Sequence, residues 1–108
     1  MTNITTFDAL GDTTRRSLFE LLRQGPRSVN ELASAMPVSQ PAVSQHLKVL
    51  KEASLVRVQV QGSQRIYSID PAGLANLRSY VDSLWDDVLA AYLQAAENLT
   101  QEEPDGTT

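Results

Sequence analysis

The most constraining feature of the sequence is a pair of short helical patterns that a single proline separates. In residues 29–36 apolar side chains recur at the spacing of one helix face, and a Ser-x-x-Glu capping box begins at Ser28. Pro37 ends this pattern because proline cannot continue a helix. Ser39 is a good N-cap for a second helical pattern, residues 40–52. The sequence therefore predicts two short helices joined by a tight turn.

The hydrophobic period changes directly after the second of these helices. In residues 55–60 valines alternate with polar residues, and a period of two is typical of a strand. Residues 61–64, Gln-Gly-Ser-Gln, supply turn chemistry, and residues 65–69 have the composition of a returning strand. We therefore expect residues 55–69 to form a β-hairpin.

A further helix is predicted on each side of these elements. Asp12 is a good N-cap for a helix over about residues 13–24, which Gly25 and Pro26 end. A long helix is predicted from Pro71 onward, because apolar residues recur there seven apart and widen into a stripe. The stripe is longer than a domain of 108 residues covers alone, which indicates a partner subunit.

The length and composition fit an ordinary globular protein. The chain has 108 residues and no cysteine, which excludes disulfides and thiolate metal sites within it. We expect residues 1–100 to form one domain and residues 101–108 to form a disordered acidic tail. The first residues carry no apolar leader and no apolar run is long enough to span a bilayer, so we expect a cytoplasmic protein that does not contact a membrane.

Charge is distributed unevenly along the chain. The net charge of −4 is unusual for a nucleic-acid binder, because such a protein needs a basic face to neutralise phosphates. All nine Lys and Arg residues lie within residues 1–78, where the net charge is +3, whereas residues 79–108 have a net charge of −7. The chain is therefore divided into a basic part and an acidic remainder.

The predicted order of helix, helix, turn, helix, hairpin and long helix is that of a winged helix-turn-helix. This fold is mainly α with a β-hairpin wing, an α+β fold, and the second helix of its pair fits the major groove of DNA. Because Val43, Leu47 and Leu50 form the inward stripe of that helix, its outer face and the wing carry the candidate DNA-binding residues. These are Ser39, Gln40, Ser44, Gln45, Lys48, Arg57, Gln61 and Arg65.

The residue types on this surface suit base and phosphate recognition. Gln40 and Gln45 offer paired donor and acceptor atoms to adenine, and Lys48 reaches phosphate or guanine. Arg57 and Arg65 flank the tip of the hairpin, from which they reach phosphates or the adjacent minor groove. We therefore expect double-stranded DNA as the partner of this surface.

Residues 7–16, 38–50 and 67–71 read FDALGDTTRR, VSQPAVSQHLKVL and YSIDP. In these stretches the chain resembles the ArsR-type (arsenic-repressor-like) family of dimeric bacterial repressors, and the similarity runs over about residues 5–95. The resemblance implies a homodimer that is built from the N-terminal and C-terminal helices. It also implies binding to a palindromic operator and, in many relatives, repression of the protein's own operon.

The apolar stripe and the resemblance together indicate a candidate dimer interface. Two recognition helices that lie about one duplex turn apart read a two-fold symmetric site. The interface residues that we expect are Phe7, Leu10, Leu74, Leu77, Val81, Leu84, Trp85, Val88, Leu89 and Tyr92. Trp85 and Tyr92 have a second interpretation as the lining of an effector pocket.

The chain departs from the family pattern in two respects. Many relatives sense metals through a Cys-x-Cys pair that aligns with Ser28 and Asn30, and others through histidines on the last helix that are missing here. We therefore expect no metal and no cofactor. The family also favours glycine just after the recognition helix, where this chain has Ser54. A left-handed residue there costs about 1 kcal/mol, or another geometry replaces it.

Several polar residues have structural as well as functional interpretations. We expect His46, the single histidine, to be a packed structural residue rather than a ligand or a base. The aspartates within residues 82–87 are interpreted as a solvated acidic face rather than as a cation site. Arg15, Arg16 and Arg23 fit a solvated helix face and phosphate contacts equally well.

These observations favour a sequence-specific, DNA-binding transcriptional regulator, a homodimeric repressor of a palindromic operator. An enzyme is not expected, because one histidine, no cysteine and scattered serines provide no convergent catalytic set. The alternative is a winged-helix protein-interaction module without DNA binding, which exposed apolar anchors on the outer face of residues 40–48 would favour. Control by the repressor's own concentration and release by a small organic ligand or a partner protein both remain open.

Overall fold

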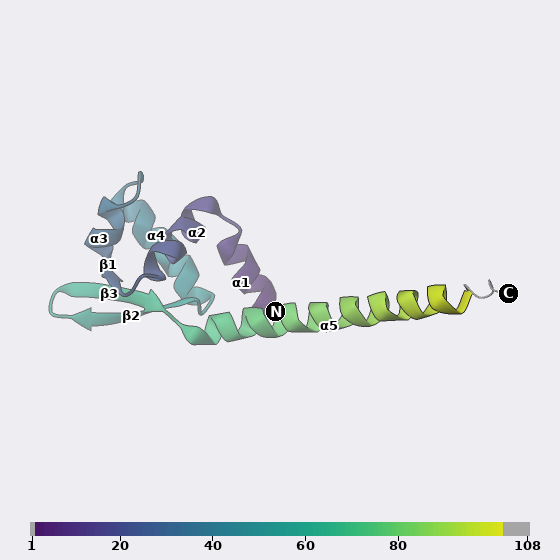
Figure 1. The fold of residues 1–108 in the computed structure, drawn as a ribbon. Coiled ribbons are helices and arrows are strands. Elements are labelled where there is room, and N and C mark those ends of the chain that lie inside the picture. The colour runs from purple at the N-terminus through teal and green to yellow at the C-terminus, as the bar shows by residue number, and fades with distance from the viewer. Residues whose placement is uncertain (1, 103–108) are drawn as a thin grey trace. The chain divides into compact units, whose positions relative to one another are not determined.

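The computed structural model describes residues 2–102 and divides into two units, Met1–Leu77 and Arg78–Thr108. The second unit is described as far as residue 102. Figure 1 shows the elements in chain order. They are α1 (Thr2–Leu10), α2 (Thr13–Leu22), β1 (Arg27–Ser28), α3 (Val29–Ser34), α4 (Gln40–Glu52), β2 (Val56–Gln61), β3 (Gln64–Ile69) and α5 (Pro71–Glu102).

Three helices begin at the caps that the sequence predicts. The Asp12 carboxylate accepts a hydrogen bond of 3.0 Å from the backbone N–H of Arg15 at the start of α2. Ser28 and Glu31 form a complete capping box at the start of α3, with the Ser28 hydroxyl accepting from the Glu31 N–H. The hydroxyl of Ser39 caps α4 in the same way. Each cap satisfies backbone donors that a helix start leaves without partners inside the helix.

The sheet of the first unit has three antiparallel strands in the order β1-β3-β2. The predicted hairpin is confirmed, and its register pairs Val56 with Ile69 at one end and Gln61 with Gln64 at the other. Gly62, the first of two loop residues, has a φ of 63°, as a tight two-residue hairpin turn requires. Strand β1 was not predicted, because two residues are too short to show a period.

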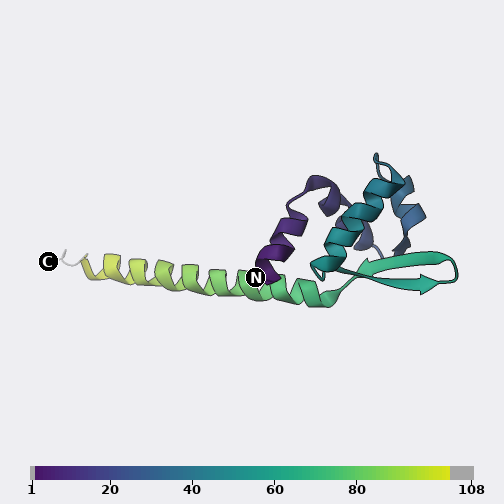
Figure 2. The ribbon, with the colours of Figure 1, turned by 180° about the vertical axis from the view of Figure 1, so that it is seen from behind.

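The core of the first unit lies between the helices and the hairpin. Figure 2 shows α4 beside α2 and above the sheet, and the contacts of α4 include α1, α2, α3 and β2. Its inward stripe is confirmed, since Val43, Leu47 and Leu50 are fully buried. Burying a side chain of this size contributes about 1.5–3 kcal/mol, so these three residues fix the rotation of α4 about its axis.

Helix α5 begins in the first unit and forms the described part of the second. It continues through Glu102, so residues 101 and 102, which we expected to lie in a disordered tail, are helical. The rest of the expected tail lies outside the described residues. Among residues 2–102 no helix combines the length and the apolar character that crossing a bilayer requires.

Candidate nucleic-acid interface

The outer face of α4 is polar and exposed. The exposed residues of this face are Gln40, Ser44, Gln45 and Lys48. The buried stripe of Val43, Leu47 and Leu50 lies on the other side of the helix. No large apolar side chain is among the exposed residues of α4. This surface therefore offers hydrogen-bond donors, acceptors and positive charge, and it lacks the apolar anchors of a protein-docking helix.

The wing has two different faces, which the register of the hairpin defines. Arg65 pairs with Val60 and, two residues on, Tyr67 pairs with Val58. Side chains two residues apart in a strand share a face, so Arg65 lies on the same face as buried Tyr67. Arg57 pairs with Ser68 and is therefore on the opposite face. The wing presents one arginine, not two, on the side of Tyr67.

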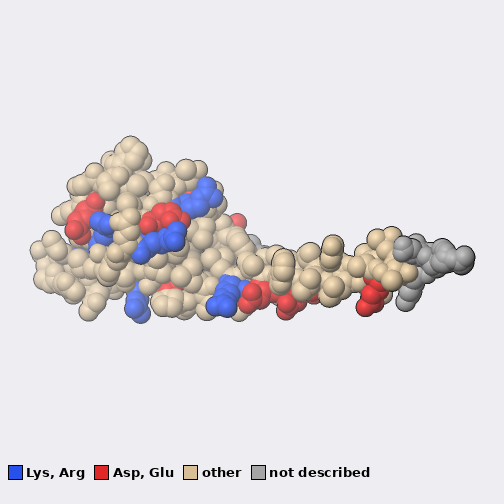
Figure 3. All heavy atoms as spheres, viewed as in Figure 1, with Lys and Arg blue, Asp and Glu red and all other residues tan. Residues whose placement is uncertain are grey.

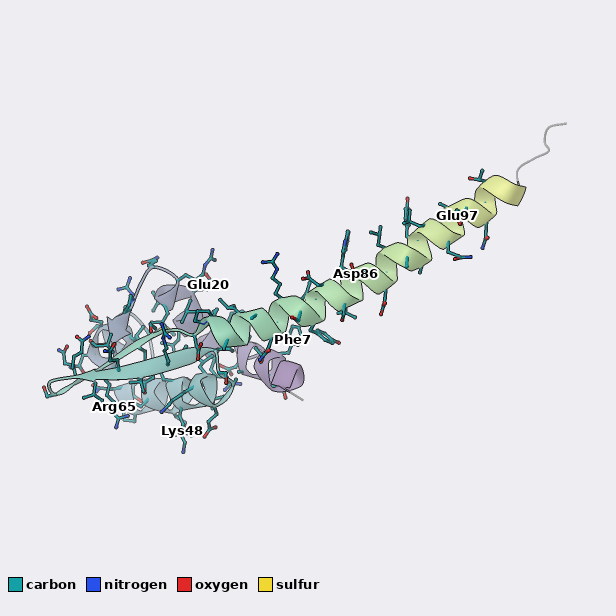
Figure 4. All side chains as sticks on the ribbon, turned by 90° about the horizontal axis from the view of Figure 1, so that it is seen from below. Phe7, Glu20, Lys48, Arg65, Asp86 and Glu97 are labelled. Carbon is teal, nitrogen blue, oxygen red and sulfur yellow. The ribbon has the colours of Figure 1, made fainter. Side chains whose placement is uncertain are left out.

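An open groove of about 410 Å³ runs between the recognition helix α4 and strand β3. We call it the α4–β3 groove. Its lining includes three cationic side chains and no acidic one. The residues that line it are Val29, Pro41, Ser44, Gln45, Lys48, Lys51, Arg65 and Tyr67. In Figure 4 Lys48 and Arg65 lie on the same side of the first unit.

A second open hollow, of about 330 Å³, continues the α4–β3 groove toward the hairpin tip. The two share Val29, Ser44 and Arg65. The other residues of this hollow are Ser28, Asn30, Gln40, Ser63 and Gln64. Nearly all of its lining residues are therefore polar, and Arg65 is their charged member, a combination that suits a phosphodiester backbone.

The structure brings together five of the eight predicted DNA-binding residues. Gln40, Ser44, Gln45, Lys48 and Arg65 line the two hollows. The other three are placed differently, as follows: the Ser39 hydroxyl caps α4, Gln61 is exposed at the last pair of the hairpin, and Arg57 is on the other face of the wing.

Sequence reasoning missed Lys51 as a member of the groove. Its spacing was a usable signal, since Ser44, Lys48 and Lys51 stand at i, i+4 and i+7 and therefore share one helix face. Ser63 and Gln64 at the hairpin tip were also missed, because no sequence pattern shows which loop lies beside the start of α4.

Two of the three N-terminal arginines have structural partners. The Arg15 guanidinium donates through Nε to the Ala9 carbonyl at 2.7 Å and through Nη2 to the Asp8 carbonyl at 3.3 Å, so it ties α2 to the end of α1. Arg23 forms a 2.9 Å ion pair with Glu20. The Arg15 contacts therefore hold α2 to the end of α1, whereas the Arg23–Glu20 pair lies on an exposed helix face.

Asp12, the N-cap of α2, has a lowered pKa. The backbone N–H of Arg15 donates to this carboxylate and lowers the pKa of Asp12 below its ordinary value of 3.8, while desolvation opposes the change. The positive charges of Arg15 and of His46 lower the pKa further. The His46 side chain is half-buried on α4.

The second unit presents a long apolar face. Val81, Leu84, Trp85, Val88 and Tyr92 are between 46% and 69% exposed, and Leu89 is 38% exposed. In the first unit Leu74 and Phe7 are also exposed, whereas Leu10 and Leu77 pack partly against the core. Figure 3 shows acidic side chains along α5. Among residues 2–102 no three His, Cys, Asp or Glu side chains are grouped so that they hold a metal ion.

Comparison with known proteins shows which class of protein has this fold and this surface. A family model described as a helix-turn-helix domain matches residues 10–59. The HTH-type transcriptional regulator Rv2034 of Mycobacterium tuberculosis is 50% identical over 92 residues, which are 85% of this chain and 86% of that protein. The arsenical resistance operon repressor of Escherichia coli is 34% identical over 80 residues, which are 73% of this chain and 68% of that protein.

Solved structures agree with these relatives. An ArsR-like transcriptional regulator from Rhodococcus sp. RHA1 has a TM-score of 0.72 at 32% identity, with 88% of this chain and 92% of that chain covered. A homodimeric winged helix-turn-helix DNA-binding domain from Mycobacterium bovis, described as a possible ArsR-family regulator, has a TM-score of 0.65 at 28% identity, with 82% of each chain covered.

The fold and the site therefore define a winged helix-turn-helix, DNA-binding regulator of transcription. Within that class the chain belongs to the ArsR family of transcriptional regulators.

Proposed function

We propose that two copies of this chain bind a palindromic operator and repress transcription from it, with α4 in the major groove and the wing on the flanking backbone. The observation that carries the proposal is the α4–β3 groove, in which Lys48, Lys51 and Arg65 stand beside the polar outer face of α4. A helix with such a face fits the major groove, and cations on its flank neutralise phosphates.

The residues divide into two roles in this proposal. Gln40 and Gln45 read base edges, because a glutamine amide presents a donor and an acceptor together. Lys48, Lys51 and Arg65 bind phosphates and hold the helix in register, which contributes affinity on any sequence. The local positive charge of the groove explains how a chain of net charge −4 binds DNA, since its acidic residues concentrate beyond residue 78.

The exposed apolar face of α5 supplies the dimer in this proposal. Exposed apolar side chains in such a row mark an interface, and a symmetric dimer matches a two-fold operator. The related domain from Mycobacterium bovis is described as homodimeric, and an Escherichia coli relative as an operon repressor. An effector of such a dimer, a small organic ligand or a partner protein, would bind between the subunits near Trp85 and Tyr92.

The test is fluorescence anisotropy of the purified chain with a labelled duplex from its own upstream region, at two salt concentrations. A scrambled duplex of the same length is the control. We expect tighter binding to the upstream duplex, and binding to both duplexes that weakens steeply with salt. Equal affinity for both duplexes at both salt concentrations contradicts the proposal and favours a protein-interaction module.

A further inference from the structure

Helix α5 begins against the backbone that links α4 to the wing. Gly73, in the first turn of α5, has no side chain to separate the two segments. A Cβ atom at this position would overlap the Ser54 carbonyl oxygen and would lie 2.8 Å from the carbonyl carbon of Ser54 and 3.1 Å from the Cα of Leu55. Ordinary contacts of a Cβ atom begin at about 3.4 Å. All three neighbours are backbone atoms, so no rotamer change relieves the overlap.

The segment opposite Gly73 is itself constrained. Ser54 has a φ of 62°, and it is the only residue other than glycine within residues 2–102 that has a positive φ. Its N–H donates to the Lys51 carbonyl at 2.9 Å, and the N–H of Leu55 donates to the Leu50 carbonyl at 3.0 Å. These bonds end α4 in a left-handed cap and hold the first residue of the wing to the last turn of the recognition helix.

A further bond ties α5 to the same place. The N–H of Asp70 donates to the Leu55 carbonyl at 2.9 Å, and the Asp70 carboxylate accepts from the N–H of Ala72 at 3.0 Å. Residues 70–73 are thus fixed to residues 54–55 by a hydrogen bond on one side and a backbone contact on the other. We call this contact between Ser54-Leu55 and Asp70–Gly73 the α4–α5 joint.

The position of the α4–α5 joint in the chain gives it a role. The recognition helix α4 ends at it, and α5, which carries the apolar face of the proposed dimer, begins at it. In a dimer held by α5, the distance between the two recognition helices therefore depends on how α5 leaves each joint. Half-sites lie about 34–36 Å apart along the duplex, and the two recognition helices of a dimer must be separated by the same distance to bind both.

From this we infer that Gly73 is a positioning residue, which sets the spacing of half-sites that the dimer accepts by allowing α5 to lie directly on the Ser54 carbonyl. The inference rests on the proposed function, since it needs a dimer that binds a two-fold site. It goes beyond that function because Gly73 contacts neither DNA nor the partner in this account. A methyl group at residue 73 must displace α5 from the joint in each subunit, because the atoms that it would overlap belong to the backbone.

The test measures spacing preference rather than affinity alone. An inverted repeat that the wild-type chain selects from a random duplex library is rebuilt with one and two base pairs added or removed between its half-sites, and a duplex with one half-site is included. We expect Gly73→Ala to bind the selected repeat about tenfold more weakly than wild type, to bind the single half-site unchanged, and to prefer an altered spacing. Gly11→Ala is the matched control, since a Cβ there meets only ordinary contacts at 3.4 Å.

A second variant loosens the joint instead of filling it. Ser54→Gly suits a left-handed position and gives the backbone more freedom, so the protein is expected to fold and to lose less affinity than wild type when the spacing is changed. A Gly73→Ala chain that loses single-half-site binding in parallel with the repeat, or a Ser54→Gly chain with the wild-type spacing profile, overturns the inference. A wild-type chain that selects no inverted repeat overturns the proposed function instead.

Discussion

Lys48 of α4 and Arg65 of β3 line one groove, although seventeen positions separate them in the sequence. The register of the hairpin causes this, because it places Arg65 on the face of buried Tyr67 and Arg57 on the other face. The recognition helix and the wing therefore present their positive charge to the same space. In the proposed complex this space holds a DNA backbone.

Replacing a lysine of the groove should weaken DNA binding without changing sequence preference. Each phosphate contact contributes about 0.9 to the slope of log K against log salt, so Lys48→Ala and Lys51→Ala should each flatten that slope by about one unit. Titrations at four or more salt concentrations give the slope. Arg57→Ala removes the same charge from the other face of the wing and should leave the slope unchanged. If Lys48→Ala, Lys51→Ala and Arg57→Ala all gave the same salt slope, the residues that contact phosphates would have to lie outside the groove.

Replacing Gln45 should alter specificity rather than the salt slope. A bidentate contact from a glutamine to adenine discriminates against the wrong base by about 1–3 kcal/mol, and alanine removes that discrimination at one position of each half-site. Selection of binding sites from a random duplex library by wild type and Gln45→Ala measures it. An unchanged site preference would mean that Gln45 does not read a base.

A charge on the apolar face of α5 should prevent dimerisation. Val88 is 62% exposed in the single chain, and an aspartate there would be buried without a partner in a dimer. We expect Val88→Asp to sediment as a monomer under conditions in which wild type is a dimer, and to lose preference for an inverted repeat over a single half-site. Ser83→Asp adds the same charge at a position where the side chain is exposed and bonded within its own helix, and it should remain dimeric. A dimeric Val88→Asp chain would refute this interface.

The cap at Asp12 should give the first unit a defined acid sensitivity. Since the pKa of Asp12 is lower in the folded chain than the ordinary value of 3.8, the charged cap stabilises the fold above that value, and the contribution is lost as the pH falls through the folded pKa. Thermal unfolding of wild type and Asp12→Asn between pH 2 and pH 6 tests this. Asparagine caps a helix as well but does not titrate, so the variant should lose less stability than wild type below pH 4. Parallel curves would show that the cap does not titrate in this way.

The sequence predicted the elements whose boundaries are set by local chemistry. Caps at Asp12, Ser28 and Ser39 and the terminator Pro37 act within one helix turn, and the structure confirms each of the predicted helices and the hairpin. Of the two geometries that the sequence left open at Ser54, the structure has the left-handed one. These features need no knowledge of tertiary contacts.

Features that depend on contacts between distant segments were not predicted. Strand β1 exists because it pairs with β3, and its two residues show no pattern by themselves. Arg57 and Arg65 lie on opposite faces of the wing because of the hairpin register. The sequence did not show which residues of the two strands pair, so it did not show which face each arginine is on. The contact between Gly73 and the Ser54 carbonyl is likewise invisible in the sequence, because glycine near a helix start has several uses.

Site-directed photocrosslinking tests the central claim most directly. The chain has no cysteine, so a single cysteine at Ser44→Cys, Arg65→Cys or Arg57→Cys carries a photocrosslinker at one known place. With an inverted-repeat duplex that the wild-type chain selects, we predict crosslinks to DNA from residues 44 and 65, on the α4–β3 groove, and none from residue 57 on the opposite face of the wing. Crosslinks from residue 57 alone, or equal yields from all three positions, would contradict the assignment of the groove as the DNA-binding surface.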